Sequence, residues 1–166
     1  MRTRMVHGGW KLGEPPIASG VAEVVRSEHP VFPEQAKLFG LFHFQKYEYF
    51  DSSYSHWGDF RILHNEQGIP WTAYLSAAGL NGKTAFYGLK ALAHPQPREK
   101  IFVTTGAGSV GLVVCQPCTS WGLSVLASTD TDEKAEYLRS LGISAFNYRT
   151  ASTSHELEKF GGVDIY

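Results

Sequence analysis

Three glycines stand at the spacing G-x-G-x-x-G in the stretch "VTTGAGSVGLVV", as Gly106, Gly108 and Gly111. The stretch follows an apolar run and opens into residues with helical spacing, the context in which this spacing binds a dinucleotide. We assign Gly106 to a tight turn, Gly108 to close approach of a diphosphate, and Gly111 to close packing of helix on strand. The diphosphate is expected to bind free N–H groups where the helix begins. A strand–helix turn that binds nothing is the alternative.

Two charged residues after the next predicted strand bear on the choice of cofactor. An acidic residue at this place usually holds the ribose 2′-hydroxyl of NAD, whereas basic residues accept the 2′-phosphate of NADP. Asp130 favours the first, and Lys134, one helical turn further on, favours the second. The residues alone therefore leave both NADPH and NADH open.

Other chemistry-bearing residues give weaker patterns. Cys115 and Cys118 form a C-x-x-C inside a predicted helix, without the two further ligands that a zinc site needs. We interpret them as ordinary buried thiols, with a redox or metal role as the alternative. The seven histidines are scattered and form no H-E-x-x-H motif, so we expect no metal and name no catalytic residue.

The composition narrows the class of protein. With 43% hydrophobic and 19% charged residues, the chain of 166 residues has the composition of a globular protein. A net charge of −1 offers no basic surface for nucleic acid or anionic lipid. No apolar run is long enough for a membrane span, and "MRTRMVHGGW" lacks the apolar core of a secretory signal. With no signal and two cysteines that show no pairing pattern, we expect a cytoplasmic protein.

The elements that would position these residues change character near residue 70. Before it, short alternating or apolar stretches punctuated by proline and glycine predict a β-rich half: "GVAEVVRS", "LFGLFHFQKYEYF" and "DFRILH". After it come two helical stretches, "WTAYLSAAG" and "GKTAFYGLKALA".

From "KIFVT" onward, predicted strands alternate with helices. The strands are "KIFVT", "LSVLAST", "SAFNY" and the start "VDIY", with helices after the glycines and at "DTDEKAEYLRSLG" and "SHELEKFG". This alternation predicts a parallel sheet of four strands with right-handed crossovers. Pro117 lies inside the helix after the glycines, where we expect it to kink the helix or end it near Val113.

Several longer motifs occur together and in a fixed order: "MRTRM", "GVAEVVRSEHPVF", "GLNGKTAFYGL", "TTGAGSVGLVV", "DEKAEYLRSLG" and "AFNYRT". With these motifs the chain resembles the zinc-free medium-chain dehydrogenase/reductases. Within them it is most similar to the NADP-dependent 2-alkenal reductases of the leukotriene B4 12-hydroxydehydrogenase (prostaglandin reductase) type, and in particular to their fungal members.

The resemblance implies a GroES-like β-rich substrate domain and a Rossmann domain that binds NADPH. It implies NADPH-dependent reduction of the C=C bond of α,β-unsaturated aldehydes and ketones without zinc, by a possible homodimer. Carried over by motif, the diphosphate would be met by Gly108, Ser109, Val110 and Gly111. Lys134 and Tyr148 would contact the 2′-phosphate, and Thr84 would lie near the nicotinamide.

The chain is shorter than members of this family, which are roughly twice its length. We therefore expect residues 1–75 to form a partial GroES-like domain and residues 76–166 to form the first half of a Rossmann domain. Relative to the family, segments would be missing at both ends, and Asp130 stands where a glycine is usual. A truncated, non-catalytic dinucleotide-binding module and a quinone reductase of the same superfamily stay open as alternatives.

Overall fold

The computed structural model describes residues 13–51, 53 and 59–166. The motif "MRTRM" lies outside these described residues. The chain divides into two compact units, residues 1–75 and 76–166. Whether these units act as the substrate and cofactor domains stays a prediction.

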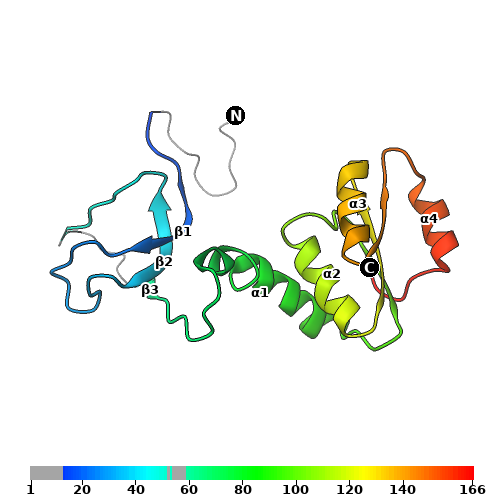
Figure 1. The fold of residues 1–166 in the computed structure, drawn as a ribbon, viewed down its shortest axis with the longest axis horizontal. Coiled ribbons are helices and arrows are strands. Elements are labelled where there is room, and N and C mark those ends of the chain that lie inside the picture. Colours follow the sequence, from blue (N-terminus) through cyan, green and yellow to red (C-terminus); the bar gives the residue numbers. More distant parts are fainter. Residues whose placement is uncertain (1–12, 52, 54–58) are drawn as a thin grey trace. The chain divides into compact units, whose positions relative to one another are not determined.

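The first unit contains an antiparallel sheet in the order β1–β2–β3 (Figure 1). Strand β1 (Ile17–Glu23) pairs with β2 (Lys37–His43) over its whole length, and β2 pairs with the short β3 (Arg61–Ile62). The core is small and aromatic: Phe60 stacks on Phe42 at 5.3 Å and meets Phe50 edge-on at 5.0 Å. A 3₁₀ turn, η2 (Trp71–Leu75), ends the unit. The predicted β-rich character of this half is confirmed.

The second unit is a parallel sheet with helices on both faces. It begins with α1 (Leu80–Tyr87), which continues into a π-helical turn, η3 (Gly88–Ala93). The sheet order is β4–β5–β6, and three helices connect or follow the strands. The bounds are β4 (Lys100–Val103), α2 (Gly111–Ser120), β5 (Ser124–Thr129), α3 (Asp132–Ser140), β6 (Ser144–Asn147) and α4 (Thr153–Phe160).

Alternation along the strands assigns a different set of side chains to each face of this sheet. Odd-numbered strand residues such as Ile101, Val125 and Ala127 join one buried cluster with α2 and α3, which includes Leu138. Even-numbered residues pack on the other face beneath α4: Phe102, Leu126 and Phe146 against Leu157 and Phe160. Figure 1 shows α4 on the opposite side of the strands from α2 and α3.

The fourth predicted strand is present only as a beginning. Ile165 makes an isolated parallel bridge to Ile101 of β4, and the Phe102 amide donates to the Ile165 carbonyl at 3.0 Å. The described sheet therefore has three strands, with a fourth starting beside β4. The mixed α/β fold class, with an antiparallel sheet and a parallel sheet flanked by helices, is confirmed.

Helix α2 corrects one expectation. It runs unbroken from Gly111 to Ser120, so the prediction that Pro117 ends it near Val113 is wrong. The Trp121 amide still donates to the Pro117 carbonyl at 2.8 Å, so bonding resumes beyond the proline. Burial of Cys115 and Cys118, both 0% exposed, holds the two sides of the proline against the sheet. Among the described residues, no helix combines the length and apolar character needed to cross a membrane.

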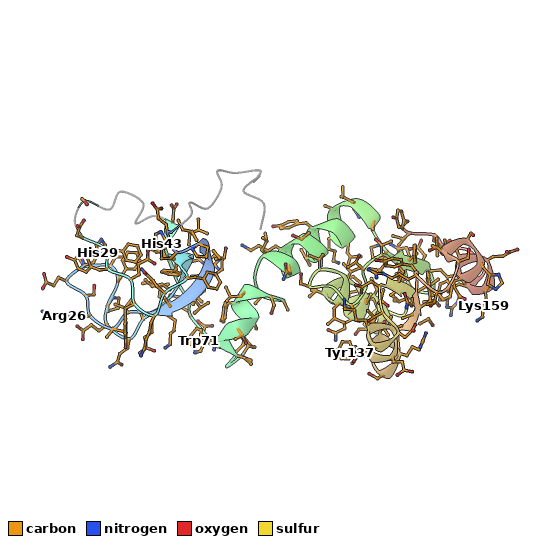
Figure 2. All side chains as sticks on the ribbon, turned by 90° about the horizontal axis from the view of Figure 1, so that it is seen from above. Arg26, His29, His43, Trp71, Tyr137 and Lys159 are labelled. Atoms are coloured by element: carbon orange, nitrogen blue, oxygen red, sulfur yellow. The ribbon has the colours of Figure 1, made fainter. Side chains whose placement is uncertain are left out.

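Leu138 tests the packing of α3 on the sheet, because its side chain is 0% exposed within the largest buried cluster. Leu138→Ala is expected to lower the free energy of unfolding by about 2–5 kcal/mol, through lost burial and an incompletely filled cavity. Its neighbour Tyr137 points away from the sheet in Figure 2 and is 50% exposed, so Tyr137→Ala is the matched control. Urea unfolding measures both, and equal losses would contradict the assigned packing.

Candidate functional site

The glycine turn follows β4, the strand at which the order of strands in the sheet changes side. Strand β4 ends at Val103, and the turn leads from its carboxyl end into α2. From β4 the chain builds β5 and β6 on one side, then returns at Ile165 on the other side of β4. In open α/β sheets, ligands bind outside the carboxyl ends of the strands at such a switch point. The turn therefore occupies the place where this architecture binds ligands.

The glycines are required by close packing within the turn. A Cβ on Gly111 would overlap the Thr105 carbonyl oxygen and lie 2.9 Å from the Gly106 Cα. A Cβ on Gly106 would lie 2.5 Å from the Ala127 Cβ of β5. Both glycines therefore allow close approach: Gly111 brings α2 against the turn, and Gly106, itself within the turn, brings it against β5. The left-handed residue of the turn is Thr105, with φ of 54°, and Gly106 allows close approach to β5 instead.

Some backbone amides of the turn already donate a hydrogen bond within the protein, and the others are available to a ligand. The Gly106 amide donates to the Ser128 carbonyl at 2.9 Å, and the Gly108 amide donates to the Thr105 carbonyl at 2.8 Å. In the part of the chain that the structure describes, the amides of Ala107, Ser109, Val110 and Gly111 donate to no acceptor. Gly108, expected to meet the diphosphate, can therefore do so only by giving it room.

These available amides fit an anion. Val110 occupies the N-cap position of α2, and no side chain caps this helix. Unbonded N–H groups and the positive end of the helix dipole favour a phosphate at such a terminus. Ser109 is exposed, so the approach is open to solvent. The donor set suits a diphosphate, and the assignment of Ser109, Val110 and Gly111 to it stays a prediction.

A second group of polar residues gathers beyond the end of β5. The Lys134 ammonium donates to the Asp130 carboxylate at 2.7 Å, across one turn at the start of α3. The Lys134 hydrogen bond, with further help from the charges of Lys134 and Arg149, lowers the pKa of Asp130 below its ordinary value of 3.8. Thr131 is the N-cap of α3 and accepts the Lys134 amide at 3.3 Å. Lys134 is thus already engaged with a carboxylate.

The end of β6 is tied to the same place. The Tyr148 amide donates to the Thr129 carbonyl at 3.0 Å, which brings Tyr148 beside the last residue of β5. The Tyr148 side chain is 47% exposed. The Arg149 amide donates to the Asn147 side-chain oxygen at 3.0 Å, and its charge acts on Asp130. The structure therefore places Tyr148 beside the end of β5, close to the pair of Lys134 and Asp130, and the contact of Lys134 and Tyr148 with a 2′-phosphate stays a prediction.

Arg149 is the residue that sequence reasoning missed. It directly follows Tyr148 in the motif "AFNYRT", and this adjacency is the available signal. An arginine next to a residue that is expected to contact a phosphate is itself a candidate to pair with that phosphate.

Thr84 lies on α1 in the same unit as the glycine turn. It is exposed, and its hydroxyl donates to the Leu80 carbonyl of its own helix at 2.9 Å. The hydroxyl can therefore only accept a further hydrogen bond. Its predicted place near the nicotinamide stays a prediction.

The C-x-x-C pair belongs to the core. Cys115 and Cys118 are free thiols, both 0% exposed, on the face of α2 that packs on the sheet. Burial, with a smaller contribution from Cys118, raises the pKa of Cys115 from 9.0 to about 12. The interpretation as buried thiols is confirmed. Among the residues described, no group of three or more His, Cys, Asp or Glu side chains is placed to hold a metal ion.

Two surface hollows lie away from the glycine turn. One, of about 280 Å³, is in the first unit between β1, Lys37 and Trp71, the last labelled in Figure 2. The Lys37 ammonium there pairs with Glu23 and lies 6.0 Å from the Trp71 ring centre. The other, of about 440 Å³, lies between Lys90, His94 and Trp121. Neither includes a predicted site residue.

Comparison with known proteins agrees with this architecture. No family model matches the chain. It is 30% identical to the NADP(+)-dependent 2-alkenal reductase of Nicotiana tabacum, covering 100% of this chain and 50% of the relative. It is 30% identical to prostaglandin reductase 1 of Rattus norvegicus (94% and 47%) and 29% identical to (+)-pulegone reductase of Mentha piperita (90% and 44%). The chain thus spans about half the length of the curated relatives it matches.

Among solved structures, CurA of Vibrio vulnificus in complex with NADPH superposes with a TM-score of 0.81 at 23% identity. The superposed region covers 98% of this chain and 48% of the CurA chain. The quinone oxidoreductase of Thermus thermophilus has a TM-score of 0.55 at 28% identity, covering 65% and 35%. The antiparallel sheet followed by a Rossmann-type sheet and its glycine turn is the fold of the medium-chain dehydrogenase/reductases. Over about half of their length, the chain is similar to reductases such as the 2-alkenal reductase and prostaglandin reductase 1.

Gly111 tests the close packing of α2 on the turn. Gly111→Ala is expected to lower the free energy of unfolding by about 1–3 kcal/mol, because its Cβ has no room beside the Thr105 carbonyl. Gly88→Ala is the matched control, since Gly88 has helical angles and nothing within 4 Å of an added Cβ. Thermal unfolding compares the two variants, and a Gly111→Ala protein as stable as the Gly88→Ala protein would contradict the geometry.

The two thiols are expected to react only when the chain opens. At pH 8 the folded protein should release almost no thionitrobenzoate from 5,5′-dithiobis(2-nitrobenzoate), whereas protein unfolded in guanidinium should release two equivalents.

Because the folded pKa of Cys115 is raised above 9.0 to about 12, its contribution to stability is complete below pH 9 and is lost as the pH rises towards 12. Rapid reaction of the folded protein at pH 8 would contradict burial.

Proposed function

We propose that this chain binds NADPH and forms part of a zinc-independent reductase that reduces the C=C bond of α,β-unsaturated aldehydes and ketones. The observation that carries the proposal is the set of available amides at Ala107, Ser109, Val110 and Gly111, at the switch point of a Rossmann-type sheet. The named activities of the relatives support it, since they include a 2-alkenal reductase and a pulegone reductase.

The chain's own residues would hold the cofactor at three places. The available amides and the end of the α2 dipole would neutralise the diphosphate. Residues beyond the ends of β5 and β6, with Tyr148 among them, would hold the ribose 2′-phosphate, and the share of Lys134 depends on its ion pair with Asp130. Thr84 would accept a hydrogen bond at the nicotinamide end.

NADPH, when bound, supplies the hydride for the β-carbon of the unsaturated substrate. What the protein must add is orientation and exclusion of water, which needs no acid–base dyad for this first step. Residues 1–75, as a partial GroES-like substrate domain, and residues 76–166, as a partial Rossmann domain, would share these tasks. We propose NADPH as the cofactor. NADH stays the alternative, because Asp130 follows β5 at the place where an acidic residue can accept the ribose 2′-hydroxyl of NADH.

The proposal is tested with the purified chain. NADPH at 100 times its dissociation constant is expected to stabilise the folded state by about 2.7 kcal/mol, seen as a rise in the melting temperature. Ser109→Asp should abolish this rise by placing a carboxylate among the phosphate-binding amides, while Ser120→Asp, at the other end of α2, should keep it. No rise with wild-type protein would contradict the proposal.

Turnover separates the candidate functions. Loss of NADPH absorbance with trans-2-hexenal supports the alkenal reductase, and loss with 1,4-naphthoquinone alone supports the quinone reductase. The quinone oxidoreductase of Thermus thermophilus, at 28% identity, is the reason to include this second substrate. Binding of NADPH without turnover of either substrate would instead support the non-catalytic module.

A further inference from the structure

The cations beyond β5 are not equivalent, and the difference bears on how the proposed nucleotide site chooses between NADPH and NADH. The Lys134 ammonium is bound to the Asp130 carboxylate at 2.7 Å, with both side chains partly exposed. A phosphate that approached Lys134 would have to displace this carboxylate or accept a second negative charge beside it. Either event costs binding energy, so Lys134 is a poor anchor for a phosphate while Asp130 is ionised.

Arg149 is in the opposite situation. Its backbone is fixed by the hydrogen bond from its amide to the Asn147 side chain at 3.0 Å, and Asn147 in turn donates to Asp132 at 3.0 Å. The guanidinium itself makes no hydrogen bond or ion pair with any residue that the structure describes. The preceding residue, Tyr148, donates its amide to the Thr129 carbonyl at 3.0 Å, which places Arg149 close to the end of β5 and Asp130. The charge of Arg149 also contributes to the lowered pKa of Asp130. A free guanidinium is well suited to paired hydrogen bonds with a phosphate.

We propose that Asp130 neutralises Lys134 and thereby makes Arg149 the residue that recognises a ribose 2′-phosphate in this chain. This inference rests on the proposed function, because it concerns the adenosine end of the same nucleotide. Asp130 also keeps lone pairs for a 2′-hydroxyl, so it lowers the preference for NADPH over NADH from both directions. Asp130 and Arg149 are therefore specificity-determining residues, and Lys134 gains this role only when Asp130 is removed.

Two ligands isolate the group in question. Adenosine 2′,5′-bisphosphate and adenosine 5′-monophosphate differ only by the 2′-phosphate, and isothermal titration of the full chain gives the dissociation constant of each. The single variants are Arg149→Met, Lys134→Met and Asp130→Asn, and the double variant combines the last two. Two controls remove an exposed charge elsewhere: Glu133→Gln in the first turn of α3, and Lys159→Met on α4, labelled in Figure 2.

The expected pattern is not additive. Arg149→Met should weaken the bisphosphate about tenfold and leave the monophosphate unchanged, while Lys134→Met should change either by less than about twofold. Asp130→Asn should tighten the bisphosphate about tenfold and weaken the monophosphate, and adding Lys134→Met should remove that gain. Both controls should keep the wild-type ratio of the two constants.

Two results would overturn the inference. In one, Lys134→Met weakens the bisphosphate in the wild-type background as much as Arg149→Met does. In the other, Asp130→Asn changes the ratio of the two constants no more than Glu133→Gln. If the wild-type chain binds neither ligand, the proposed function fails and this inference fails with it. Binding of both ligands with additive substitutions sinks the inference alone.

Discussion

Helix α2 can begin beside the end of β4 only because two backbone segments touch without side chains between them. A Cβ at Gly111 would meet the Thr105 carbonyl and the Gly106 Cα, and a Cβ at Gly106 would meet Ala127. With these contacts made, α2 buries Cys115 and Cys118 against the odd-numbered face of the sheet. The same placement leaves the amides of Ala107, Ser109, Val110 and Gly111, in the turn and at the first residue of α2, without an acceptor among the described residues. One packing constraint thus fixes both the core of the second unit and its candidate phosphate site.

The ends of β5 and β6 add charge to this edge. Backbone hydrogen bonds tie Tyr148 to Thr129, so the residues that follow the two strands share one small surface. That surface carries the Asp130 carboxylate, the Lys134 ammonium that pairs with it, and the Arg149 guanidinium. Because these groups are partly exposed, their pairing contributes little to the free energy of unfolding, and we propose that it instead sets which ribose fits there.

Much of the fold could be predicted from the sequence, because period and turn residues agree along the second half. The strands at "KIFVT", "LSVLAST" and "SAFNY" lie where alternation and glycines place them, and α3 has the predicted acidic start and late arginine. The expectation for Pro117 is wrong because the local cost of a proline in a helix is offset by the burial of Cys115 and Cys118 on either side. The left-handed Thr105 escapes prediction because the adjacent glycine is the usual residue for such a conformation.

The residues of the candidate site could be predicted from the sequence, but their hydrogen bonds and ion pairs could not. Spacing identifies Gly106 and Gly108, but it does not reveal that their amides are bonded within the protein, at 2.9 and 2.8 Å. Nor does it reveal that Lys134 pairs with Asp130, or that the Arg149 side chain pairs with none of the residues that the structure describes. The hydrogen bond from Gly106 to Ser128 joins segments far apart in sequence. The contacts of Gly108 with Thr105 and of Lys134 with Asp130 are local, but spacing alone does not show which partner each group takes.

The most direct test of the account is the ¹H–¹⁵N correlation spectrum of the chain during titration with NADPH. We expect the largest shifts at the amides of Ala107, Ser109, Val110 and Gly111, with further shifts at Tyr148 and Arg149. Largest shifts around Lys90 and Trp121, or none in the glycine turn at saturating NADPH, would contradict the central claim.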